Sequence, residues 1–87
     1  MPIFGEDAEK TEFVERVKIK AKEEKVPIII PDEFKLNKQT CSEIIFKGEA
    51  QVSNFLKLAF LFRKPIILYE YTFYILVDNE IYTLKNK

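Results

Sequence analysis

Apolar side chains recur at helical spacing in the charged first third of the chain. No glycine or proline interrupts residues 6–25, and the helix-favouring residues Ala, Glu, Lys and Arg dominate them. Residues 17–22 also alternate strictly between apolar and basic side chains, a pattern typical of a strand. Residue type favours the helix, and we predict one over about 7–25. Its apolar stripe, within about 100° of arc, comprises Phe13, Val14, Val17 and Ala21.

Two short apolar runs flank a polar stretch in the next part of the chain. Residues 26–30, which are β-branched and bounded by prolines, and residues 43–47 are typical of strands. Residues 31–42 lie between them, and about 12 residues is long for a loop in a compact domain. Two interpretations stay open: the loop is functional or mobile, or Phe34 and Leu36 tie a surface excursion to the core.

A second helical pattern, over residues 49–64, is apolar on too many sides for one buried face. Leu61 lies outside an apolar arc that already spans about 200°. Arg63 and Lys64 suit the negative end of the helix dipole, and Pro65 ends the helix. We predict that this helix packs against a sheet and against a second helix or another subunit. The arc contains Val52, Phe55, Leu56, Leu58, Ala59, Phe60 and Phe62.

The last third of the chain is rich in β-branched and aromatic residues, which predicts strands over 65–71, 73–77 and 80–84. Asp78 and Asn79 tolerate the positive φ of a two-residue hairpin turn. Both faces of this hairpin are apolar, so it needs cover on two sides. The turn pairs Val77 with Glu80, Ile75 with Tyr82 and Phe73 with Leu84 on one face, and Leu76 with Ile81 and Tyr74 with Thr83 on the other.

Together these patterns predict a single small α+β domain over residues 1–87. Two helices, at about 7–25 and 49–64, pack on one face of a mainly antiparallel sheet of four to five strands. The strands are expected at about 26–30, 43–47, 65–71, 73–77 and 80–84.

The apolar surplus on the second helix and the hairpin is the strongest functional signal. Two helices do not cover both hairpin faces, and tyrosines on strands suit protein interfaces. The leading hypothesis is therefore a non-enzymatic protein-interaction module acting as a homo-oligomer, most simply a two-fold dimer. A small-molecule pocket among the aromatic residues is the alternative. The expected interface residues are Leu58, Leu61, Phe62, Tyr69, Tyr71, Phe73, Tyr74, Leu76 and Ile81.

The composition excludes most catalytic machinery. The chain has no histidine, which removes Ser-His-Asp and Cys-His triads and the usual zinc ligand sets. Its 2 glycines cannot form a phosphate-binding loop, so we expect no cofactor. The single Cys41 is interpreted as an inert thiol. A carboxylate-dependent metal nuclease remains as a third hypothesis, with Glu70 expected to be partly buried in an apolar strand, although Glu43 and Lys47 are mis-spaced for the usual acid-x-lysine pattern.

The charges are unevenly distributed although 14 basic and 14 acidic residues cancel. Residues 35–64 hold six basic against two acidic side chains, and Phe34 is available for base stacking. The second hypothesis is therefore a nucleic-acid-binding accessory protein, although the pI of 6.3 lies below the value above about 9 typical of dedicated binders. The expected contacts are Lys35, Lys38, Lys47, Lys57, Arg63 and Lys64.

No stretch reaches the roughly 20 apolar residues that span a bilayer, and the chain turns acidic before a signal-peptide core could form. We therefore expect a cytoplasmic protein with no membrane partner. Many Lys and Glu residues against few Gln, Asn, Cys and Met also indicate a thermophilic source.

Overall fold

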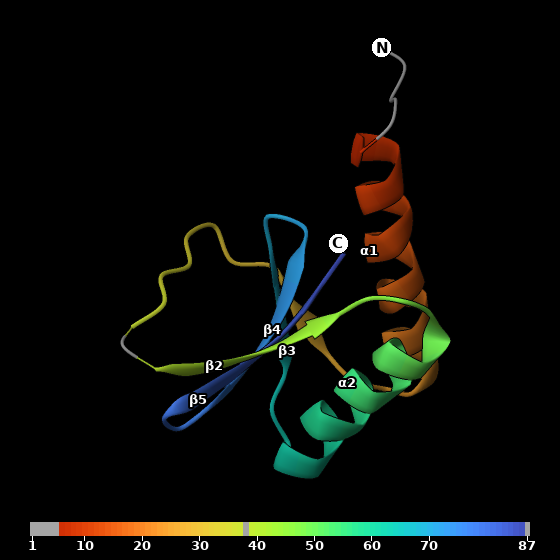
Figure 1. Ribbon diagram of the computed structural model, residues 1–87. Helices are drawn as coiled ribbons and strands as arrows, with labels where there is room; N and C mark the ends of the chain where they lie inside the picture. Colours follow the sequence, from red (N-terminus) through yellow and green to blue (C-terminus); the bar gives the residue numbers. More distant parts are fainter. Residues whose placement is uncertain (1–5, 38, 87) are drawn as a thin grey trace.

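Two helices form one layer against a five-stranded sheet in the computed structural model, which describes residues 6–37 and 39–86 (Figure 1). Within these residues the arrangement confirms the predicted α+β class with two helices on one face of the sheet. In chain order the elements are α1 (Glu6–Glu23), β1 (Ile28–Ile29), β2 (Thr40–Ile45), α2 (Glu49–Phe62), β3 (Ile66–Tyr69), β4 (Thr72–Val77) and β5 (Glu80–Lys85).

The sheet is mixed, whereas a mainly antiparallel sheet was predicted. Its strand order is β1-β3-β4-β5-β2; β4 is antiparallel to β3 and β5, whereas β1 is parallel to β3 and β2 is parallel to β5. Of the five described strands, β4 therefore runs opposite to the other four. Tight turns reverse the chain before and after β4. Strands β2 and β3 run in the same direction, and the connection between them is therefore long and contains α2.

The polar stretch after β1 crosses the sheet. Because β1 and β2 lie at opposite edges and run in the same direction, the segment between them, described at residues 30–37 and 39, must pass over one face. They pass over the face opposite the helices, where the ring of Phe34 packs against Tyr69 and Tyr74. The stretch is shorter than the predicted loop because β2 begins at Thr40 rather than near residue 43.

Two tight turns set the register of the three C-terminal strands. The turn at Asp78 was predicted, and the pairs that it implies on both hairpin faces are confirmed. The turn at Glu70 and Tyr71 was missed, because strands were predicted over 65–71 and 73–77. Both residues have positive φ, 47° and 63°, as a two-residue primed turn requires. Neither is the Gly, Asn or Asp that would have signalled it.

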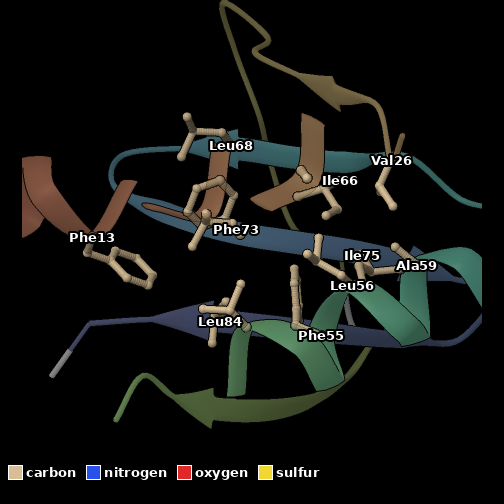
Figure 2. Packing of buried hydrophobic residues seen from close by; sticks show 13 residues of the cluster. Phe13, Val26, Phe55, Leu56, Ala59, Ile66, Leu68, Phe73, Ile75 and Leu84 are labelled. Atoms are coloured by element: carbon tan, nitrogen blue, oxygen red, sulfur yellow. The ribbon is translucent and has the colours of Figure 1, made fainter. Parts of the chain in front are cut away.

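The main core lies between the helices and the facing side of the sheet (Figure 2). The buried stripe of α1 is Phe13, Val17 and Ala21, which confirms the predicted helix over the competing strand, and Ile19 points away at 58% exposure. The Phe13 and Phe73 rings meet edge to face, with centroids 5.6 Å apart. From α2 and the strands the core takes Val52, Phe55, Leu56, Ala59, Ile66, Leu68, Phe73, Ile75 and Leu84.

Candidate protein-interaction surfaces

The side of the sheet turned away from α1 and α2, here named the far face, has no helix over it (Figure 1). Strand alternation places its side chains between the buried positions of the core face. Ile81 and Thr83 at its centre are buried, whereas the apolar residues around them are half-buried or exposed. Those surrounding residues are Ile29, Ile45, Ile67, Tyr69, Tyr74 and Leu76.

Residues 30–37 and 39 give the far face an incomplete cover. The Phe34 ring lies 4.7 Å from that of Tyr74 and 5.8 Å from that of Tyr69, centroid to centroid. The side-chain amide of Gln39 donates a hydrogen bond of 3.1 Å to the carbonyl oxygen of Asp78. Leu36 on the same segment remains 47% exposed. One irregular segment thus partly covers this face of the sheet, whereas two helices cover the other.

A single ion pair neutralises the charges that the strands place on the far face. Lys85 Nζ lies 2.8 Å from Glu43 Oε1 across the β2–β5 pairing. The hydrogen bond to this carboxylate, together with its charge, raises the pKa of Lys85 above the ordinary lysine value. Charge therefore does not oppose the approach of a second apolar surface to these strands.

A second apolar surface lies where both helices end. On α2, Phe60 is 75% exposed and Leu61 is 72% exposed, although four neighbours on the same helix are buried. Phe60 stands between two hollows of about 560 and 310 Å³, which we together name the helix-end groove. Its apolar walls are Val26, Pro27, Leu56, Ala59, Phe60, Leu61 and Pro65.

Both helices end in the same backbone turn beside this groove. At the end of α2, Arg63 N–H donates to Phe60 and Lys64 N–H to Ala59, with Arg63 at φ 54°. At the end of α1, residues 25 and 26 bond in the same way to Lys22 and Ala21, with Lys25 at φ 59°. This is the Schellman turn, whose left-handed position is usually glycine. Here a cation occupies it in both helices.

The rim of the helix-end groove is basic. Its cations are Lys25, Lys57, Arg63 and Lys64, against one carboxylate, Glu24. Glu24 is already engaged, since its Oε2 lies 4.0 Å from Lys20 Nζ. Within the described ranges none of the four cations takes part in an ion pair. Each of them is therefore available to an acidic partner.

The nine residues predicted for the oligomer interface do not form one surface. Leu58, Leu61 and Phe62 lie on α2, on the opposite side of the sheet from Tyr69, Tyr74 and Leu76. Phe73 and Ile81 are buried within the chain, so neither can contact a second copy in this fold. Tyr71 is 47% exposed at the β3–β4 turn, where Lys10 Nζ lies 5.9 Å from its ring centroid.

Phe62 contacts the chain itself rather than presenting its ring to solvent. Its ring stacks on Tyr82 with centroids 5.9 Å apart. The Tyr82 hydroxyl donates a 2.7 Å hydrogen bond to Glu80, and acceptance by this carboxylate raises the pKa of the phenol. Leu58 likewise packs against the core. Of the three predicted α2 residues, Leu61 is thus the exposed one.

Of the six cations predicted to contact nucleic acid, the five that the structure describes are also separated. Lys57, Arg63 and Lys64 flank the helix-end groove, and Lys47 precedes the opposite end of α2, roughly 20 Å away at 1.5 Å per residue. Lys35 lies on the segment over the far face, and Lys38 lies outside the described residues. The fold thus gathers three of the six.

The described residues offer little for catalysis. Among them no group of three or more Cys, Asp and Glu side chains is placed to hold a metal ion. The expectation that Glu70 is partly buried in a strand is wrong, because the residue is exposed in the β3–β4 turn. Cys41 is a free, exposed thiol on β2. In the same residues neither helix has the length and apolarity that a membrane span requires.

Comparison of the chain with protein-family models, curated proteins and solved structures finds no match.

Sequence reasoning missed two contributors to the helix-end groove. Phe60 was counted in the broad apolar arc of α2 but not among the expected interface residues, although it lies about 90° from the centre of the buried stripe at 100° per residue. Val26 was assigned to a strand, but it follows the left-handed Lys25 and lines the groove. The sequence did contain a signal for this groove. After both helices, a basic residue and one further residue precede Pro-Ile-Ile.

Proposed function

We propose that this chain is a non-enzymatic protein-interaction module that forms a homo-oligomer, most simply a two-fold dimer, by packing the far faces of two sheets together. The observation that carries the proposal is that both helices lie on one face, leaving an apolar opposite face under one irregular segment. A sheet that is apolar on both sides needs a second layer. Another copy supplies that layer.

The far face suits a contact between copies better than the helix-end groove does. A two-fold contact brings each residue near its own counterpart or near residues around it. Across the far face this brings together apolar side chains and an ion pair that is already neutral. At the helix-end groove it would bring two basic rims together, which like-charge repulsion opposes.

Solution mass tests the proposal. Leu36→Glu combined with Ile29→Glu puts charge on the segment over the far face and on the far face itself, at positions that are 47% and 49% exposed, so the folded single copy tolerates the change. We expect the parent chain to be dimeric by light scattering at micromolar concentration and this variant to be monomeric. Leu61→Glu is the matched control, an exposed leucine on the other side of the molecule, and it should stay dimeric. A monomeric parent chain contradicts the proposal.

The nucleic-acid alternative has less support, since the five predicted cations that the structure describes lie at three separate places. We also propose a cytoplasmic location in a heat-adapted organism. The free thiol of Cys41 and the Lys- and Glu-rich composition support this setting.

A further inference from the structure

We infer that the helix-end groove docks an acidic amphipathic helix from another protein. This goes beyond the proposed function, because it concerns the opposite side of the molecule and a different partner. It rests on three properties of the groove: its exposed apolar walls, its unpaired basic rim, and the lack of backbone groups that an extended peptide could bind.

The apolar walls supply the contact. Phe60 and Leu61 are the two most exposed large apolar residues of the described chain, and they stand above the buried Val26, Leu56 and Ala59. Exposed apolar side chains that gather around a hollow mark a protein-interaction site. A hollow on each side of Phe60 gives two places for apolar side chains of a partner.

The basic rim sets the charge of the partner. Four cations without ion pairs surround the groove, against one carboxylate that Lys20 already engages. Two of them, Lys25 and Arg63, occupy left-handed positions where glycine is the usual residue. The negative ends of both helices offset part of this charge but leave it positive. A partner with carboxylates beside its apolar residues complements it.

The backbone around the groove favours a helical partner. An added strand would need a sheet edge with free N–H groups. Pro27 and Pro65 in the walls have no N–H, and the N–H groups of Val26 and Lys64 are used in the two Schellman turns. Ile66 N–H is bound to the Pro27 carbonyl at 2.9 Å. An amphipathic helix satisfies its own backbone and binds through side chains alone.

The test is a fluorescence-anisotropy titration of the full chain with a labelled synthetic peptide. The probe is a helix of about 15 residues with leucines at i, i+3, i+4 and i+7 spacing and glutamates elsewhere. A counterpart with lysine in place of every glutamate is the charge control. We expect saturable binding of the acidic peptide and at least about tenfold weaker binding of the basic one, an effect that salt reduces.

Two variants of the chain make the test specific. Phe60→Ser with Leu61→Ser removes the exposed anchors and should weaken acidic-peptide binding at least about tenfold. Lys57→Glu with Lys64→Glu should reverse the preference toward the basic peptide, an outcome that a merely unfolded variant does not give. The matched controls Ile19→Ser and Lys47→Glu, an exposed apolar residue and a cation away from the groove, should bind as the parent chain does.

Four outcomes overturn the inference. Equal binding of the two peptides would show that the basic rim does not select the partner. Parent-like binding by the Phe60→Ser, Leu61→Ser variant would show that the groove is not the binding site. Co-sedimentation with phosphatidylserine vesicles that this variant loses, without acidic-peptide binding, assigns the surface to a membrane. A change of oligomeric mass in the same variant assigns the groove to a second copy. Failure of the far-face dimer alone leaves peptide binding intact, so the two proposals fail separately.

Discussion

The two faces of the sheet are built from the same strands, yet one is closely covered by helices and the other only partly covered by an irregular segment. The core face meets two helices through a continuous set of buried residues, whereas the far face meets one segment whose best-defined contact is the Phe34 ring on Tyr69 and Tyr74. Neighbouring residues on β4 differ accordingly: Phe73 is fully buried and Tyr74 is half-buried. The difference shows that this chain packs one face of its sheet closely and leaves apolar side chains of the other face only partly covered.

The largest expected effect separates these two neighbours. Phe73→Ala removes a ring from the packed core and should lower the free energy of unfolding by about 3–5 kcal/mol. Tyr74→Ala should cost about 1–2 kcal/mol at low protein concentration, because its ring is only partly covered. Urea unfolding at about 1 μM measures both. An equal loss in the two variants would mean that the chain alone completes both cores.

The next effect concerns the cover of the far face. Phe34→Ala removes two aromatic contacts and should cost about 1 kcal/mol of folding free energy. It should also release residues 30–37 from the far face, which would be measured as faster amide hydrogen exchange there and faster tryptic cleavage after the exposed Lys35. Leu36→Ala, on the same segment but largely exposed, is the control. Unchanged exchange in Phe34→Ala would show that the segment is held by something other than this ring.

On the helix side, a smaller gain is expected where the backbone is strained. Arg63 holds a left-handed conformation that costs a residue with a Cβ roughly 1–2 kcal/mol. Arg63→Gly removes this conformational cost but raises the conformational entropy of the unfolded chain. We therefore expect a net increase in the free energy of unfolding of about 0.5–1 kcal/mol, measured by urea unfolding. Arg63→Ala should not stabilise. A destabilised Arg63→Gly would show that the side chain, rather than the turn, supports the helix end.

The smallest effect is the alkaline response of the far-face ion pair. Because the folded pKa of Lys85 is raised, its contribution is complete below the unfolded pKa of about 10.4 and is lost as pH rises through the folded pKa. Parent chain and Glu43→Gln should therefore differ by a constant amount from neutral pH to about pH 10 and converge above it. Thermal unfolding across this range measures the difference. A difference that is constant up to the highest pH would show that the pair contributes nothing.

Local features of this fold were predictable and long-range ones were not. The β4–β5 hairpin and its register followed from Asp78 and Asn79, because a two-residue turn fixes its own pairing. The parallel pairing of β1 and β2 depends on where α2 and residues 30–39 carry the chain, and no local residue pattern records that. The turn at Glu70 and Tyr71 uses residue types that rarely take positive φ.

The candidate surfaces were likewise predictable only where local periodicity decides which side chains are exposed. The overloaded pattern of α2 correctly placed Leu61 outside the buried arc, because helical periodicity is local. The same reasoning put Phe73 and Ile81 at an interface, although other segments of the chain bury them. Which apolar face a chain covers by itself depends on contacts distant in sequence, so the groove between the two helix ends was visible only in the fold.

Sedimentation equilibrium of the parent chain over the micromolar range tests the central claim most directly. Two sheets packed through their far faces predict a mass that rises with concentration toward twice the 10.3 kDa of one copy. A mass that stays at one copy throughout that range would show that the far face needs no partner, and would contradict the account.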